Sequence, residues 1–348
     1  MKASKKDVPV IVLDIGGTNF RSSIFTREKG LTKKPLKVPT PNFINNPNLD
    51  IETLQKLLIN MIVETITNYR RVNPKLTLIG LSFGAPITSD GVVNQASTIW
   101  GNKGKDFPLR KSLSKLLPGV RILIANDITA AAERYASMKE HRNVDYFAVI
   151  AVSSGIGSKI YDVKNRSVIL DSRSVGGEMG HVKVDYRLKA PICDCGGRGH
   201  LGALSSGRAV ERMAISEANK NPGDFAKSLL YSLAKKPEAI NNRLLVKAIK
   251  AGDKFCLRIL DRATFPLACA IAHISGGIGV DKFIIDGGFA LNCGDMYLES
   301  LRASLSKTDF YSREKAEIPT LVELGINDDS DCLIGIGLLT QNKYAKDA

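Results

Sequence analysis

The sequence predicts an α/β protein with two related lobes. Short apolar segments rich in β-branched residues alternate with segments of helical periodicity, which favours buried sheets covered by helices. A strand, a turn of small residues and a second strand occur near residues 8–25 and again near residues 146–162. This internal repeat indicates two halves that face each other across a cleft, and 348 residues are enough for both.

Each element follows from its local pattern. Apolar runs that end in small or polar residues predict strands at 8–14 and 120–127, and a strand within 75–87 that ends in a Gly/Pro turn. They also predict a strand, a turn and a further strand over 146–162, and a strand from residue 280 that ends in Asp-Gly-Gly. Helical spacing of apolar residues predicts helices over 50–69, 128–140, 206–219, 225–234, 242–277 and 331–344. We expect a smaller N-terminal lobe over residues 1–124, with a C-terminal helix of about 333–348 packing back on it, and a larger lobe over 125–332.

Composition and charge argue against several classes of protein. The formal charge is +14, but no basic run exceeds a pair such as Lys33-Lys34 and no zinc-finger spacing occurs, so nucleic-acid binding is not the expected function. A basic surface also attracts anionic substrates. No apolar run reaches the roughly 18–20 residues of a membrane span. The first apolar run ends at Asp14, unlike that of a signal peptide, so we expect a cytoplasmic protein.

Three turns of small residues have the chemistry of a phosphate site. In "LDIGGTNFR" the glycines allow close backbone approach, and Asp14 follows a strand, where a carboxylate can hold the waters of Mg²⁺. An ordinary hairpin turn would have similar residues. Because "VSSGIGS" (152–158) and "IIDGGFALN" (284–292) add two further turns, the three together favour a nucleotide site. The residues expected to bind ATP are Asp14, Gly16, Gly17, Thr18, Asn19, Ser154, Gly155, Gly157, Gly287 and Gly288.

The order of these motifs resembles that of the ROK family (repressors, open reading frames and kinases). The motifs are "DIGGTNFR", "GLSFGAPI", "IANDITAA", "SSGIGS", "GGEMGHV", "CDCGG" and "IIDGGFA", and they span nearly the whole chain. The resemblance implies the two-lobed actin-like or hexokinase-like fold, which is ribonuclease H-like, with a nucleotide and sugar cleft between the lobes. It also implies a glucokinase-like sugar kinase that uses ATP and Mg²⁺. We also expect a homodimer.

"IAND" places Asn126 and Asp127 where a strand meets a helix. Either residue would also serve as a helix cap. The resemblance implies that Asp127 takes the proton from a primary hydroxyl of the sugar and that Asn126 holds a neighbouring hydroxyl. Phosphoryl transfer depends mainly on positioning and charge neutralisation, so one well-placed base suffices. Glu178 and His181 of "GGEMGHV" are further residues expected at the sugar.

"CDCGGRGH" contains two cysteines unlike the other four, which lie in apolar or small-residue settings. Together His181, Cys193, Cys195 and His200 offer the ligand types of a tetrahedral zinc site. A disulfide between the two cysteines is disfavoured because the expected cytoplasmic compartment is reducing and because so short a loop would be strained. The resemblance implies one His and three Cys in this site, so His200 stands at the place of a cysteine. We expect a structural Zn²⁺.

Two positions depart from the family pattern. Gly202 stands where glucokinases of the family usually have a Glu that holds hydroxyls near the anomeric end, and Ser97 stands at the place of an Asn. Neutral drift would explain both, but a changed substrate is the functional interpretation. We therefore expect ATP-dependent phosphorylation of the primary hydroxyl of a modified hexose-like compound, such as an amino sugar or a cyclitol. The alternatives are an ordinary glucokinase and a non-catalytic sugar sensor.

Overall fold

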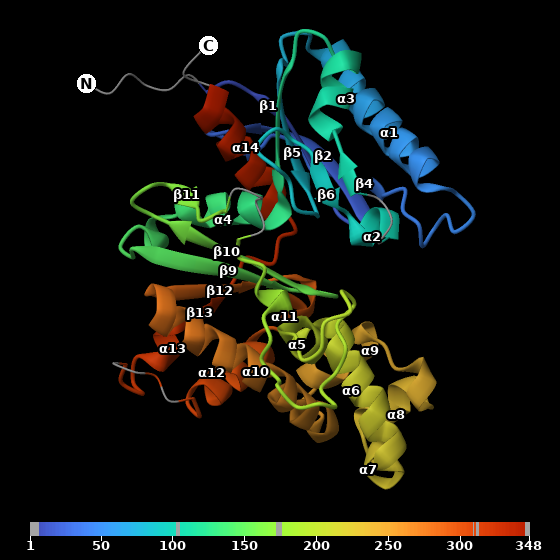
Figure 1. The fold of residues 1–348 in the computed structure, drawn as a ribbon, viewed down its shortest axis with the longest axis vertical. Coiled ribbons are helices and arrows are strands. Elements are labelled where there is room, and N and C mark those ends of the chain that lie inside the picture. Colours follow the sequence, from blue (N-terminus) through green and yellow to red (C-terminus); the bar gives the residue numbers. More distant parts are fainter. Residues whose placement is uncertain (1–6, 102–104, 172–175, 309, 311–312, 345–348) are drawn as a thin grey trace. The chain divides into compact units, whose positions relative to one another are not determined.

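The computed structural model describes residues 7–101, 105–171, 176–308, 310 and 313–344. The chain forms two compact units (Figure 1). The first unit comprises residues 1–141, 170–176 and 328–348, and the second comprises 142–169 and 177–327. Among the described residues, no helix is long and apolar enough to cross a membrane.

The first unit contains a sheet whose two central strands are entirely buried, β1 (Val10–Ile15) and β5 (Leu78–Phe83). Their sequences, VIVLDI and LIGLSF, are nearly continuous apolar runs, as expected for strands covered on both faces. The strand order is β3-β2-β1-β5-β8, and β4 also pairs with β2. β1 is antiparallel to β2 but parallel to β5. The other strands are β2 (Asn19–Thr26), β3 (Gly30–Leu31), β4 (Leu36–Pro39) and β8 (Arg121–Asn126).

Helices cover both faces of this sheet. Because side chains alternate along a strand, one face of β1 packs against α1 (Ile51–Val72) and α3 (Leu109–Leu116), and the other against α14 (Asp331–Tyr344). α14 also packs closely on α4 (Asp127–Ser137), where a β-carbon at Gly335 would lie 1.7 Å from the Ala130 carbonyl oxygen. Smaller elements are β6 (Val93–Gln95), α2 (Ser97–Trp100), β7 (Lys105–Phe107) and the 3₁₀ turn Lys139–His141.

The second unit contains a sheet with the same arrangement. Its order is β11-β10-β9-β12-β13, with β9 antiparallel to β10 and parallel to β12. The predicted repeat is therefore confirmed, since both sheets join an antiparallel hairpin to parallel strands. The strands are β9 (Tyr146–Val152), β10 (Ile156–Asp162), β11 (Ser167–Val168), β12 (Lys282–Asp286) and β13 (Val322–Leu324).

Helices make up most of the remaining second unit and bury its largest apolar cluster. The stretch 242–277, predicted as one helix, is two, α9 (Asn242–Lys250) and α10 (Lys254–Ile278). Gly252 has φ +75° and Asp253 caps the second helix, so the chain turns between them. The other helices are α5 (Leu201–Ser205), α6 (Gly207–Lys220), α7 (Pro222–Ala226), α8 (Leu229–Ala234), α11 (Gly288–Cys293), α12 (Asp295–Leu305), α13 (Ile318–Leu321) and the 3₁₀ turns Met179–His181 and Pro237–Ala239.

The boundary between the units differs from the predicted division at residues 124 and 125. α4 belongs to the first unit because it packs on α14. Arg134 of α4 also donates to both carboxylate oxygens of Asp328, over 2.7 and 2.6 Å, and pairs with Asp331 at 2.7 Å. These contacts hold residues 328–331 in the first unit, where α14 begins at Asp331.

Candidate active site

Asp14 lies near the carboxyl end of β1 and is almost fully buried. The Ser82 hydroxyl of the adjacent strand donates to Asp14 Oδ1 over 2.8 Å, and Arg21 Nη1 lies 3.6 Å from Oδ2. Burial raises the pKa of Asp14, and the Arg21 charge and the Ser82 hydrogen bond oppose that effect. The structure thus presents a carboxyl group at the end of a central strand that is held by the Arg21 cation, the Ser82 hydroxyl and the Cys332 thiol.

The turn between β1 and β2 is held by two buried side chains that follow β4. Thr40 donates its hydroxyl to the Gly16 carbonyl over 2.8 Å, and Asn42 Nδ2 donates to the Gly17 carbonyl over 2.7 Å. The backbone N–H of Thr40 donates to the Thr18 carbonyl over 3.0 Å. The carbonyl groups of the turn therefore accept hydrogen bonds from Thr40 and Asn42, which fixes the path of the backbone at Gly16–Asn19.

Asn126 and Asp127 form the start of α4. Asn126 is the N-cap, and its Oδ1 accepts from the N–H groups of Ile128 and Thr129 at 3.0 and 3.3 Å. Asp127 Oδ1 accepts from the Ile128 N–H and from Asn126 Nδ2, both over 2.9 Å. One carboxylate oxygen of Asp127 is thus fixed by the helix start, so the capping role and a chemical role are compatible.

Gly84 brings Asp127 close to the first turn. Its N–H donates to the Ile15 carbonyl over 2.9 Å. A β-carbon at position 84 would lie 3.4 Å from that oxygen, 3.5 Å from Asp127 Oδ2 and 3.7 Å from the Gly16 Cα. The ends of β1, β5 and β8 therefore gather Asp14, the Gly16 turn and Asp127 at one edge of the first sheet.

The corresponding edge of the second sheet has a turn built from backbone groups. The Ser153 carbonyl accepts from the Gly207 N–H at the start of α6, and the Ser153 hydroxyl accepts from the Gly288 N–H, over 2.8 and 2.9 Å. Arg208 Nε donates to the Ser154 carbonyl over 2.9 Å. Gly155 has no atom within 4 Å of its ideal β-carbon position, so this side of the turn is open.

A pocket of about 390 Å³ lies beside this turn, within the second unit. It brings the second and third predicted phosphate turns together, because Ser153, Ser154 and Gly288 line it along with Arg243 and Phe289. Gly287 allows the two turns to meet: its φ is +91°, and a β-carbon there would lie 2.5 Å from Val152 N. Gly157, by contrast, lies within β10 opposite Ala151 rather than in the turn.

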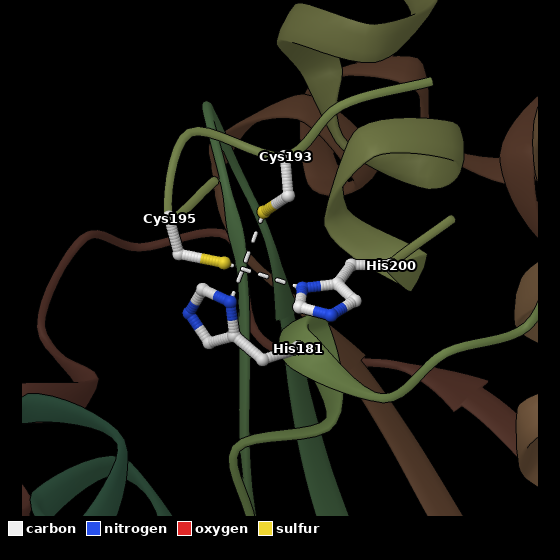
Figure 2. A group of neighbouring side chains, drawn as sticks. All are labelled: His181, Cys193, Cys195 and His200. Atoms are coloured by element: carbon white, nitrogen blue, oxygen red, sulfur yellow. Dashed lines mark hydrogen bonds between the residues drawn. The ribbon is translucent and has the colours of Figure 1, made fainter. Parts of the chain in front are cut away.

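His181, Cys193, Cys195 and His200 are brought together as the sequence predicts (Figure 2). Their ligand atoms all lie within 4.8 Å of one another, with Cys193 Sγ 3.7 Å from His181 Nδ1 and Cys195 Sγ 3.2 Å from His200 Nδ1. A tetrahedral zinc site has ligand atoms about 3.3–3.8 Å apart. The four side chains converge on one point and all have ligand chemistry that zinc accepts, so the residues fit that metal.

Tight turns shape the cysteine loop. The Cys193 N–H donates to the Gly197 carbonyl over 2.7 Å, and the Gly196 N–H donates to the Cys193 carbonyl over 2.8 Å. All six cysteines are free, so the alternative of a disulfide between Cys193 and Cys195 does not occur. Burial lowers the pKa of His200, which favours the neutral imidazole that metals bind.

The two departures from the family pattern differ in what the structure describes. The backbone of Ser97 begins α2, but its side chain lies outside the described part. Gly202 lies in the first turn of α5, and a β-carbon there would lie 3.1 Å from the Gly180 carbonyl oxygen. Gly202 is thus close to the segment that contains Glu178 and His181.

Sequence reasoning did not identify the side chains that hold the turns. Thr40 and Asn42 come from beyond the hairpin they support, and Arg208 from a helix far along the chain. The only signal was the polar pair of "TPN" after a strand, which is indistinguishable from an ordinary loop.

The protein has the two-lobed, actin-like hexokinase fold. The features that define it are two sheets of the same topology, a glycine-containing turn in each, and Asp127 at the start of α4. The ROK family model matches residues 10–343, and the chain belongs to the ROK family.

Two relatives and one solved structure illustrate the range of the family. The chain is 34% identical over 333 residues to C(7)-cyclitol 7-kinase of Streptomyces hygroscopicus subsp. limoneus, covering 95% of this chain and 93% of that protein. It is 25% identical over 339 residues to 2-epi-5-epi-valiolone 7-kinase of an Actinoplanes species, covering 95% and 92%. The ROK glucokinase of Streptomyces griseus, solved with glucose and AMPPNP, has a TM-score of 0.74 at 18% identity, covering 96% and 99%.

Proposed function

We propose that this protein is an ATP-dependent kinase that phosphorylates the primary hydroxyl of a C7-cyclitol or a closely related hexose-like compound. The observation that carries the proposal is the 34% identity, over nearly the whole chain, to a C(7)-cyclitol 7-kinase. A six-membered carbocycle with seven carbons keeps one carbon outside the ring, and a hydroxyl on that carbon is a primary alcohol. This is the type of acceptor for which a single general base suffices.

In the first unit, Asp127 is the proposed general base. The Asn126 amide and the Ile128 N–H fix its Oδ1, so the carboxylate keeps one orientation. Asn126 is proposed to hold a neighbouring hydroxyl of the acceptor in place of the 3.2 Å hydrogen bond that its Nδ2 donates to the Ala85 carbonyl. Asp14 is the proposed holder of Mg²⁺, through water, since it is a carboxylate at a strand end beside the Gly16–Asn19 turn. Mg²⁺ would neutralise charge on the phosphates.

In the second unit, the pocket beside Ser154 and Gly288 is the proposed place of the nucleoside of ATP. The turn at Gly155, where no atom lies within 4 Å of the ideal β-carbon position, leaves room for phosphate oxygens. Glu178 and His181 are proposed to contact the acceptor. The His181, Cys193, Cys195 and His200 cluster would hold a structural Zn²⁺ and so fix the loop that carries His181. The free thiols of the six cysteines fit a reducing, cytoplasmic compartment. We also propose that the protein is a homodimer.

The acceptor is distinguished from glucose by Gly202. A glycine at this position offers no carboxylate to the hydroxyls of an anomeric end, and a cyclitol has no anomeric carbon. Losing a hydrogen bond to a charged group costs about 1.5–3 kcal/mol, which is enough to make glucose a poor substrate. Ordinary glucokinase activity is the alternative within the same chemistry. A non-catalytic sensor is the alternative of another class, but it has no need of Asp127.

The test is a coupled ADP-release assay with Mg·ATP and three acceptors: 2-epi-5-epi-valiolone, glucose and glucosamine. Calorimetry on the same samples measures binding without turnover. We expect ADP release that depends on the cyclitol. Release with glucose at equal or greater efficiency supports the glucokinase alternative, and tight binding without any ADP release supports the sensor.

A further inference from the structure

Lys159 is a charged side chain that the proposed reaction does not use. It lies in the middle of β10, and its side chain is only 1% exposed. It is the one buried lysine among the residues that the structure describes. Burial of an ammonium group is costly unless the charge is compensated, so a buried lysine needs an anionic partner.

That partner is on a segment pressed against β10. Gly177 has φ +86°, and a β-carbon there would lie 2.7 Å from the Ser158 carbonyl oxygen and 3.2 Å from the Lys159 Cα. A β-carbon at Gly180 would lie 2.1 Å from the Ile156 carbonyl oxygen. The Ser158 hydroxyl also donates to the Gly177 carbonyl. Two glycines and this hydrogen bond therefore hold the backbone on both sides of Glu178 along the strand.

The backbone contacts leave the Glu178 side chain to be oriented by Lys159. Lys159 Nζ lies 3.2 Å from Glu178 Oε1, and the Glu178 side chain is 30% exposed. The ammonium is thus the buried end of an ion pair whose other end reaches solvent. Because Lys159 itself is so deeply buried, the Glu178 carboxylate is the part of the pair that a ligand can reach.

We infer that Lys159 is a positioning residue that orients the Glu178 carboxylate, with Oε1 on the ammonium and Oε2 turned to the hydroxyls of an uncharged polyol. Hydrogen bonds to a carboxylate are about twice as strong as those to a neutral acceptor, so a carboxylate that is held in one orientation strengthens polyol binding. This inference rests on the proposed function, in which Glu178 contacts the acceptor.

The experiment is a double-mutant cycle in the full-length protein with 2-epi-5-epi-valiolone and Mg·ATP. The variants are Lys159→Met, Glu178→Gln and the double variant, with the exposed Lys164→Met of the same hairpin as control. We expect Lys159→Met to raise KM for the cyclitol about tenfold, with kcat and KM for ATP within about twofold. In the Glu178→Gln background the same change should add less than about twofold. Lys164→Met should match the wild type.

Unchanged KM for the cyclitol in Lys159→Met overturns the inference. So does an equal rise with and without Glu178, or a matching rise in KM for ATP, because either means a merely structural role. Thermal unfolding establishes that each variant is folded, and Lys159→Gln replaces Lys159→Met if the latter aggregates, with a smaller rise in the same constant expected. A wild type that neither binds nor phosphorylates any polyol overturns the proposed function together with this inference, whereas an active wild type with an unaffected Lys159→Met overturns the inference alone.

Discussion

The two hairpins of the repeated sheet have the same topology but different chemistry. The last paired residues before the turn are Ile15 and Phe20 in the first unit and Val152 and Ile156 in the second, so the first turn is one residue longer. One pair further from the turn, the first hairpin has Asp14 opposite Arg21. The equivalent pair of the second hairpin is Ala151 opposite Gly157.

The two hairpins also differ in the groups that surround and support their turns. The first turn lies beside a buried carboxylate, which suits a hydrated cation, and side chains of Thr40 and Asn42 support it. The second turn has no charged pair at that position, and it is supported by the Gly207 and Gly288 N–H groups, which donate to Ser153. The two turns therefore share a backbone framework but differ in one cross-strand pair, which is charged only in the first unit.

Metal removal should have the largest effect, and only in the second unit. We expect about one zinc per chain after dialysis, since structural zinc is worth roughly 10–16 kcal/mol in peptide models. Metal analysis of the wild type and of Cys195→Ser tests this, with Cys269→Ser outside the cluster as control. Hydrogen exchange after chelation should rise over residues 181–203 and stay unchanged over residues 10–26. A fully stable wild type without metal would refute the proposed structural zinc site.

Asp127→Asn should have the next largest effect. The change keeps the shape of the side chain but removes the proton acceptor, so kcat should fall by about 10²–10⁴ while acceptor binding stays within a few-fold. Coupled ADP release measures the first quantity and calorimetry the second. Asp295→Asn is the matched control because Asp295 is also the first residue of a helix, α12, and is exposed. Near-normal turnover of Asp127→Asn would show that Asp127 is not the general base.

Alanine substitutions at Gly155 and Gly287 should have different effects, although both glycines lie in turns at the same end of the second sheet. Gly287→Ala forces a side chain into a left-handed position where Val152 N is 2.5 Å away, so we expect a loss of about 1–3 kcal/mol of unfolding free energy and weaker ATP binding. Gly155→Ala meets no atom within 4 Å and should leave stability nearly unchanged. Denaturant unfolding and the KM for ATP test the pair. Equal effects would mean that the two turns do not meet as described.

Gly202→Glu should have the smallest effect. Its β-carbon would lie 3.1 Å from the Gly180 carbonyl oxygen, so Gly202→Ala is needed to isolate the cost of the side chain from the gain of the carboxylate. Relative to Gly202→Ala, we expect Gly202→Glu to improve kcat/KM for glucose about tenfold, which corresponds to about 1.4 kcal/mol. No difference between the two variants would mean that position 202 does not select the acceptor.

Much of this arrangement could be predicted from local sequence. The buried strands around Asp14 and Asp286 and the hairpin turns have strong patterns. The cluster of His181, Cys193, Cys195 and His200 is recognisable because the last three are close in sequence. The break at Gly252 also had a local signal, a glycine before a capping Asp253, but the long apolar periodicity on both sides obscured it.

The remaining features depend on contacts between distant parts of the chain. Lys159 has the sequence pattern of an exposed residue, and only the close approach of the Gly177 segment makes it the buried partner of Glu178. Likewise, nothing near Thr40 shows that its hydroxyl supports the Gly16 turn. Such pairings arise from tertiary packing, which periodicity and turn chemistry do not encode.

The most direct test of the account is an internal competition between acceptors. Wild-type protein is given Mg·ATP with equal concentrations of 2-epi-5-epi-valiolone and glucose, and mass spectrometry measures the two phosphate esters at low conversion. Their ratio equals the ratio of kcat/KM values, whatever the absolute rate. The account predicts an excess of cyclitol phosphate of about tenfold or more, with the phosphate on the primary hydroxyl. Equal amounts, or mainly glucose phosphate, would contradict it.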